Sequence, residues 1–415
     1  MPLVKLGLVF FVIIYLTRKK CPLGYAMLIG SGMLGVIFGM GGLSVLRSAG
    51  KACVDLTTLE LASIIDLIII LSSILEEKGQ LQRILSSLQV LIRNVKVLLI
   101  ILPALIGLLP MPGGALFSAP MVKVASRRLK LTAVQHTTIN YWFRHVWEYF
   151  LPLYPGIVLA SKLSGVTLPR LALAQLPLTA IMLLSGVFFY LRGIQGPEDG
   201  NVQLDRKGNP ALESDITSPS GRLFFQLFVD ALPILLVIVL SLFMGINLII
   251  ALAVSIAVAT ALSRSKVKDV ARLILKNIPL NMIILIFGIM VFKVMLRDCG
   301  SIEDVAGFLK THHVPVILMF ALLPFLTGIL TGITVAYVGI TFPIAFALLE
   351  TQGYDLSHIV LAYGMGFVGV LLSPVHLCLL VTKDYFRAQF DKVYRSLLMP
   401  VVPIVGMAIL LFLVY

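Results

Sequence analysis

The stretch from Pro103 to Pro120 reads PALIGLLPMPGGALFSAP. It lies in an apolar region, yet its centre, Pro-Met-Pro-Gly-Gly, combines the two residue types that break helices most strongly. Irregular backbone at membrane depth is tolerated only where it packs against protein or lines a wet cavity. From Pro324 to Pro343 the chain reads PFLTGILTGITVAYVGITFP, which resembles the first stretch. The two stretches therefore predict a pair of interruptions inside membrane segments.

The composition is typical of a polytopic helical membrane protein. Of the 415 residues, 59% are hydrophobic and 13% are charged, and the mean hydropathy is +1.02, whereas soluble domains carry about 25% charged residues. The net charge of +13 comes from lysines and arginines in loops between apolar runs, which indicates membrane orientation and not nucleic-acid binding. The four cysteines stand singly, and we interpret them as small apolar residues with no metal or disulfide role.

The chain is an internal duplication. Pro103 recurs as Pro324, 221 residues later, and Tyr141 recurs as Tyr363, 222 residues later. Each half contains five predicted spans, an odd number, so the second half enters the membrane from the opposite side and the repeats are inverted. The spans lie at about 3–17, 23–42, 58–78, 133–163 and 170–192 in the first half and at about 222–243, 245–263, 274–297, 356–386 and 395–415 in the second.

The predicted fold is all-α, an inverted repeat of two halves, each with five transmembrane helices and one re-entrant hairpin. Residues 1–192 form the first repeat, 193–221 a polar cytoplasmic linker and 222–415 the second repeat. The hairpins are predicted at about 95–128 and 313–350, and the broken helices at about 133–163 and 356–386.

The distribution of basic residues predicts the orientation. With both termini outside, 24 of the 33 lysines and arginines fall on the cytoplasmic side, seven fall outside and two lie within spans. Because cytoplasmic loops carry an excess of Lys and Arg, this asymmetry predicts a multi-pass protein of the inner (plasma) membrane with its N- and C-termini outside.

The hairpin tips and the proline breaks predict a binding site near the bilayer midplane. Prolines in Leu151–Pro155 and at Pro374 free backbone carbonyls, and half-helix N-termini offer amides to an anion. A simple proline kink, and hydroxyls that repair broken helix backbone, are the structural alternatives. The predicted substrate-binding residues are Pro112, Gly113, Gly114, Ser118, Arg144, Thr331, Gly332, Thr334, Ser373 and Pro374.

Ionisable residues within the predicted spans are candidates for function, because burying them in the bilayer costs free energy unless they are paired or face water. Arg144 and Glu148 are four residues apart and either form a helical ion pair or separate into two roles, with Arg144 binding a substrate carboxylate. His145 or Glu148 would then gain and lose a coupling proton. His376, beside the second break, and Asp66, in the third span, are the other ion-coupling candidates, with interior packing as the alternative for each.

A hairpin followed by a broken helix, duplicated with inversion and carrying the segments MPGGALFSAPM and SPVH, resembles the ion transporter superfamily. That superfamily includes divalent-anion/sodium symporters, gluconate and citrate permeases and the membrane subunits of TRAP transporters. More closely, nearly the whole chain resembles an uncharacterised prokaryotic integral-membrane family assigned to it. The resemblance implies a homodimer in which a rigid scaffold carries a moving, elevator-like transport domain.

The leading hypothesis is secondary active transport of a small organic anion, a carboxylate, coupled to a proton or Na⁺ gradient. A cation/proton antiporter and the membrane subunit of a TRAP-type uptake system are the alternatives. The chain lacks a GxxxxGK[ST] motif, an HEXXH motif and a GxSxG nucleophile motif, which argues against a primary pump and against an enzyme. We predict no cofactor or metal other than Na⁺ as one of the two candidate coupling ions, and no nucleic-acid partner.

Overall fold

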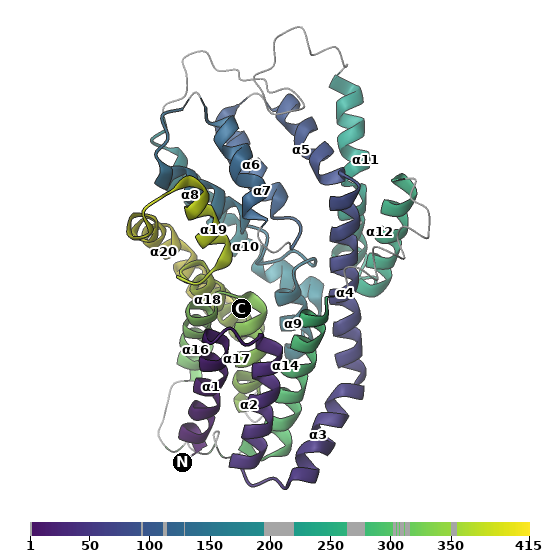
Figure 1. The fold of residues 1–415 in the computed structure, drawn as a ribbon, viewed down its shortest axis with the longest axis vertical. Helices are drawn as coiled ribbons and strands as arrows, with labels where there is room; N and C mark the ends of the chain where they lie inside the picture. Colours follow the sequence, from purple (N-terminus) through teal and green to yellow (C-terminus); the bar gives the residue numbers. More distant parts are fainter. Residues whose placement is uncertain are drawn as a thin grey trace.

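The computed structural model describes residues 2–92, 94–110, 114–127, 129–194, 220–263, 279–301, 316–349 and 355–415, with single positions at 304, 307 and 311. These residues form helices, turns and no strand (Figure 1), which confirms the predicted all-α polytopic class. Within the described ranges, five helical segments are long and apolar enough to cross a membrane on their own: Leu56–Glu77, Leu168–Leu191, Gly221–Phe243, Leu280–Asp298 and Phe390–Val414. The other apolar helices are shorter, partly because two predicted spans are each broken into two pieces.

The described helices pack into two groups, each drawing on both halves of the chain. The first bundle contains α1 (Pro2–Arg18), α2 (Leu23–Ile37), α3 (Gly42–Val54), α4 (Leu56–Glu77), α5 (Gln80–Leu91), α11 (Ser220–Ile238) with its π-helical extension η3 (Val239–Phe243), α12 (Leu248–Leu262) and α14 (Leu280–Asp298). The second bundle contains α6 (Val95–Ile106), α7 (Ala115–Ala125), α8 (Ala133–Arg144), α9 (Pro155–Ser164), α10 (Leu168–Gly186) with η1 (Val187–Leu191), α16 (Val316–Thr331), α17 (Thr334–Leu349), α18 (Leu356–Leu371), α19 (Leu377–Phe386) and α20 (Phe390–Val414).

Each of the two predicted hairpins is a pair of helices packed against each other. Helices α6 and α7 lie in the upper half of Figure 1, and α16 and α17 lie in the lower half. The matched glycines Gly107 and Gly328 let each hairpin approach its broken helix. A Cβ at Gly107 would collide with the carbonyl oxygen of Arg144, and one at Gly328 with the carbonyl oxygen of Gly366. The first contact brings the end of α6 to the end of α8, where the first break begins. Gly332, between α16 and α17, lies directly against Ser373 and His376 in the second break.

Both predicted broken helices are interrupted, but the first interruption begins earlier than the sequence suggests. Helix α8 ends at Arg144, and irregular turns cover 145–154 before α9 begins at Pro155. The predicted break at 151–155 is therefore only the end of the interruption. Proline at 152 cannot donate a hydrogen bond to the carbonyl of Glu148, and that carbonyl accepts from a tyrosine hydroxyl of the other half instead. The second interruption covers 372–376 and includes Leu372-Ser373-Pro374, where the sequence placed the break.

Two matched tyrosines tie the broken helices together. The hydroxyl of Tyr141 donates to the carbonyl of Leu371 at the end of α18 over 2.9 Å, and the hydroxyl of Tyr363 donates to the carbonyl of Glu148 in the first break over 2.8 Å. Both tyrosines are fully buried. Each half therefore supplies the donor that satisfies a carbonyl freed in the other half, which a buried polar group requires.

We expect Tyr141→Phe and Tyr363→Phe each to destabilise the protein by about 1–3 kcal/mol, because each change leaves a buried carbonyl without its donor. Denaturant unfolding in detergent measures this loss. Tyr25→Phe is the control, since Tyr25 lies exposed on α2, and it should change stability by less than about 0.5 kcal/mol. Equal stability of all three variants would show that the two cross-links do not hold the breaks together.

Candidate functional site

Arg144 lies where the first tip meets the first break. It is the last residue of α8, its side chain is buried, and its Nη1 donates to Sγ of Cys378 on α19 over 3.4 Å. The guanidinium rests against Gly114 at the start of α7, where an added Cβ would lie 2.5 Å from Nη2. The glycine at the tip is therefore what makes room for the cation. A buried guanidinium at a helix end is suited to hold a carboxylate through its planar fork.

A pair of histidines joins the two breaks. His145 is the first residue after α8, and His376 is the last residue before α19. Their Nε2 atoms lie 3.0 Å apart, and both imidazoles are buried. The ring of Tyr141 packs against both, with centroid distances of 4.7 Å to His145 and 5.5 Å to His376.

The other nitrogen of each histidine fixes its tautomer. Nδ1 of His145 lies 2.6 Å from the carbonyl oxygen of Tyr141, and Nδ1 of His376 lies 2.7 Å from the carbonyl oxygen of Gly332 at the second tip. A carbonyl oxygen only accepts, so both Nδ1 atoms carry a hydrogen. In their neutral forms the two Nε2 atoms would then face each other as acceptors. A single proton between them would satisfy this contact and would give the pair one positive charge.

Glu148 supplies the carboxyl group of the site. Its Oε1 lies 3.8 Å from Nε2 of His145, and its Oε2 accepts from the hydroxyl of Thr334 at the start of α17 over 3.0 Å. Of the two alternatives for Arg144 and Glu148, the helical ion pair is absent from the ion pairs of the described residues. Because the helix ends at Arg144, Glu148 is not on the same helical face and is directed to the second hairpin and the histidine pair.

The aromatic residues of the first break hold the first hairpin in place. The indole nitrogen of Trp147 donates to the carbonyl of Ala104 over 2.7 Å, and the hydroxyl of Tyr154 donates to the carbonyl of Gly107. Both acceptors lie near the end of α6, where helix carbonyls lack intrahelical partners. The sequence NYWFRHVWEYFLPLYP thus places its charged and its anchoring residues in and beside the first break.

The remaining predicted substrate-binding residues fall into three groups. The hydroxyls of Ser118 and Thr331 return to their own helices, donating to the carbonyls of Ala115 and Thr327, so they support backbone. Ser373 donates to the carbonyl of Ile329 over 2.7 Å and ties the second break to the second hairpin, while the adjacent Pro374 is exposed. Pro112 and Gly113 lie outside the described residues.

Asp66, a predicted ion-coupling residue, lies on α4 in the first bundle. Its buried Oδ1 has no hydrogen-bond partner among the described residues. No contact of the described chain joins it to the histidine pair, so the structure does not bring it together with His145, Glu148 and His376.

Cys378 is a member of the cluster that the sequence did not indicate, because it was interpreted as a small apolar residue. The only available signal was its position two residues after His376 in the segment SPVHLC. His145, His376 and Cys378 form the group of described residues that could hold a metal ion, with ligand atoms within 4.8 Å of one another. The guanidinium of Arg144 contacts the same sulfur, and its charge opposes a second cation at close range.

We expect Gly114→Ala to weaken anion binding about tenfold, which corresponds to ~1.4 kcal/mol, because the new methyl group displaces the guanidinium of Arg144. Ligand-induced thermal stabilisation measures the apparent affinity. Gly406→Ala on α20 is the matched control, since a Cβ there meets no atom within 4 Å. An unchanged affinity in Gly114→Ala would place the anion away from the first tip.

A family model described as "Protein of unknown function (DUF401)" matches residues 3–415. The chain belongs to the DUF401 family. No curated protein matches this DUF401 sequence. Among solved structures, it is similar to MtrF of Neisseria gonorrhoeae, with 14% sequence identity, a TM-score of 0.54 and coverage of 90% of this chain and 83% of MtrF. MtrF is described as illuminating a class of antimetabolite efflux pumps. At this identity the similarity concerns the fold, which the DUF401 chain shares with a membrane transporter.

Proposed function

We propose that this protein is a secondary active transporter that carries a small organic anion together with a proton. The observation that supports it most directly is the cluster of Arg144, His145, Glu148 and His376 at the junction of two hairpin tips and two helix breaks. The fold shared with a described efflux pump supports transport as the general activity. We also propose that the chain is a member of the ion transporter superfamily, on the basis of the duplicated hairpins and broken helices.

Arg144 selects the charge of the substrate. A permanent guanidinium charge in the site favours an anion and opposes a bare cation as the sole cargo. Among oxyanions, a carboxylate suits it, because the fork can form two parallel hydrogen bonds to its two oxygens. This preference distinguishes the proposal from a cation/proton antiporter.

The histidine pair provides the coupling proton. The proton between the two Nε2 atoms holds the first break to the second, and through Nδ1 of His376 it holds the second tip as well. Loss of the proton leaves two acceptors 3.0 Å apart, so the contact must open. Among the described residues, the other titratable or charged groups beside the pair include Arg144, Glu148, Cys378 and Tyr141. Pro374 and Val375 next to His376 are exposed, which offers the proton a path to the surface.

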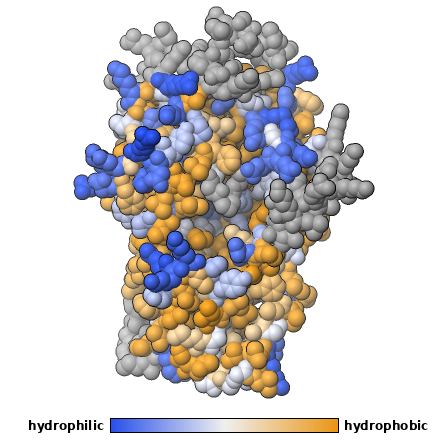
Figure 2. All heavy atoms as spheres, in the orientation of Figure 1, coloured by the Kyte–Doolittle hydropathy of each residue, from blue (hydrophilic) through white to orange (hydrophobic). Residues whose placement is uncertain are grey.

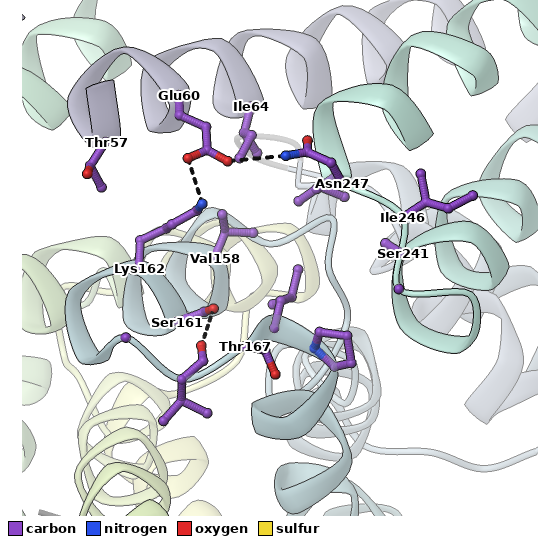
Figure 3. Close-up of a pocket in the computed structure, with 16 residues that line it drawn as sticks. Thr57, Glu60, Ile64, Val158, Ser161, Lys162, Thr167, Ser241, Ile246 and Asn247 are labelled. Atoms are coloured by element: carbon purple, nitrogen blue, oxygen red, sulfur yellow. Dashed lines mark hydrogen bonds and ion pairs between the residues drawn. The ribbon is translucent and has the colours of Figure 1, made fainter. Parts of the chain in front are cut away.

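We further propose that the second bundle moves against the first, as in an elevator. The packing between them is restricted mainly to α4 with α9, α5 with α6, α10 with η3, α14 with α17 and α1 with α16. A pocket of about 440 Å³ lies at this junction, lined by residues of α4, α9, α10 and α12. Figure 3 shows Lys162 of α9 reaching Glu60 of α4, with Nζ 2.7 Å from Oε2. An interface with an internal pocket and few helix contacts is suited to sliding.

A cross-link between Glu60→Cys and Lys162→Cys tests the motion. In a background where Cys21, Cys53 and Cys299 are serine, a short bifunctional maleimide should join the two bundles and reduce transport to the level of empty liposomes. The pair Glu60→Cys and Asn247→Cys is the control, because Asn247 also contacts Glu60, at 3.5 Å, but belongs to the first bundle. Equal transport by both cross-linked proteins would rule out movement between the bundles.

Transport in proteoliposomes tests the function itself. A thermal-shift screen of organic anions at two pH values, with and without sodium, first identifies a ligand. We expect its uptake to follow an imposed pH gradient and to be indifferent to a sodium gradient. Uptake that needs sodium and ignores pH would remove the histidine pair from coupling. Cation movement without any organic anion would favour the antiporter.

The proposal also covers the orientation of the chain in the membrane and its oligomeric state. We propose an inner-membrane protein with both termini outside, because that orientation places most basic loops in the cytoplasm. We also propose a homodimer. Cross-linking in native membranes and labelling of single cysteines from each side measure these two properties.

A further inference from the structure

A groove in the first bundle lies outside the transport site. It has a volume of about 560 Å³ and lies among the end of α4, the start of α5, the start of α11 and the end of α12. Lys78, Arg83 and Arg222 line its polar side, and Phe225, Val229 and Leu262 line its apolar side. The mechanism of transport proposed above uses none of these residues.

The groove carries an excess of positive charge. Arg83 is paired with Asp230 through three contacts, from Nε at 3.0 Å and 3.1 Å and from Nη2 at 2.7 Å. Lys78 and Arg222 have no acidic partner among the described residues. Among the described residues, one carboxylate therefore compensates one of the three cations of the groove.

The position of these cations is that of the lipid headgroups. Lys78 directly follows the membrane-spanning segment Leu56–Glu77, and Arg222 is the second residue of the segment Gly221–Phe243. Residues at the ends of spans lie at the edge of the hydrocarbon layer, where phosphate groups are found. Figure 2 shows hydrophilic side chains gathered over α5 and α11, while the lower part of the same face is mostly hydrophobic.

The apolar side of the groove distinguishes a lipid from a free phosphate ion. Phe225 is 68% exposed and Phe224 beside it is 66% exposed, so α11 offers aromatic surface within the turn that follows Arg222. A phosphate ion would use only the polar side. A phospholipid would place its phosphate on Lys78 and Arg222 and its acyl chain along Phe225, Val229 and Leu262.

We propose that this groove is a binding site for an anionic phospholipid, which holds the first bundle in the bilayer. The proposal is independent of the transported substrate. It assigns the phosphate to Lys78 and Arg222, while Arg83 is held by Asp230 and by its hydrogen bond from Nη1 to the carbonyl of Lys78.

Lipid titration of the purified full chain tests the site. Phosphatidylglycerol should raise the unfolding temperature in detergent, whereas phosphatidylcholine with the same acyl chains and inorganic phosphate should not. In the double variant Lys78→Gln/Arg222→Gln the apparent affinity for phosphatidylglycerol should fall about thirtyfold, the factor expected for two cations near a lipid surface. Arg222→Gln alone, at an exposed position, should reduce it about fivefold and serves if the double variant does not fold.

The matched control is Lys392→Gln/Arg395→Gln, which removes the same charge from exposed positions on α20. It should bind phosphatidylglycerol like the wild type. An equal loss in this control would show a non-specific charge effect and overturn the site. An equal stabilisation of the wild type by inorganic phosphate, or no stabilisation by phosphatidylglycerol, would also overturn it.

Discussion

Arg144→Ala should abolish the stabilisation of this protein by its organic anion, while the protein still folds. Removing one partner of a buried charge pair costs about 2–5 kcal/mol, so the affinity should fall at least about thirtyfold. Folding should persist because the equivalent position in the second half is Gly366, so the architecture does not need a charge there. Thermal shift and uptake measure both properties on the same preparation.

Arg144→Lys separates charge from geometry. It keeps the positive charge but loses the planar fork, so binding should be intermediate, weaker than the wild type by about tenfold. Arg395→Ala on α20 is the control for removal of an exposed arginine. An undiminished anion-induced shift in Arg144→Ala would remove this residue from the binding site.

His376→Gln should uncouple transport from the proton gradient. The glutamine amide can donate to Nε2 of His145 without binding a proton, so the two breaks stay joined at every pH. With the membrane potential held at zero, symport of one proton allows about tenfold accumulation per pH unit, because one unit corresponds to 1.36 kcal/mol. The variant should show no accumulation, yet it should still exchange labelled for unlabelled anion.

The exchange measurement separates a coupling residue from a structural one. A purely structural loss would reduce exchange and accumulation together. His358→Gln on α18 is the control, because His358 packs against Phe320 and Phe412 and contacts no residue of the cluster. Accumulation by His376→Gln that equals the wild type would mean that the shared proton is not the coupling ion.

The proposed site depends on residues that recur in both halves and on residues that occur in only one half. Tyr141 and Tyr363 make matching contacts, so the two halves are held together by the same chemistry in both directions. Arg144, His145 and Glu148 correspond to Gly366, Phe367 and Val370 in the second half. The repeated residues thus support the backbone, and the unrepeated residues carry the charge that a specific site needs.

The sequence by itself determined the helical membrane class, the duplication, the two hairpins and the approximate breaks. These features depend on local properties: the length of apolar runs, the missing amide of proline and the small size of glycine. The same reasoning selected Arg144, His145, Glu148 and His376, because ionisable groups at membrane depth are costly and rare.

Only the tertiary structure decided how these residues meet. In the structure α8 ends at Arg144. Glu148 therefore contacts Thr334 of the second hairpin, 186 positions away, and does not contact Arg144 as a helical neighbour would. The tertiary structure also brought His145 to His376, 231 positions away, added Cys378 to the cluster and mixed helices of both halves in each bundle. Such contacts depend on the packing of distant helices and on carbonyls that proline leaves unpaired, and neither is encoded in the spacing of nearby residues.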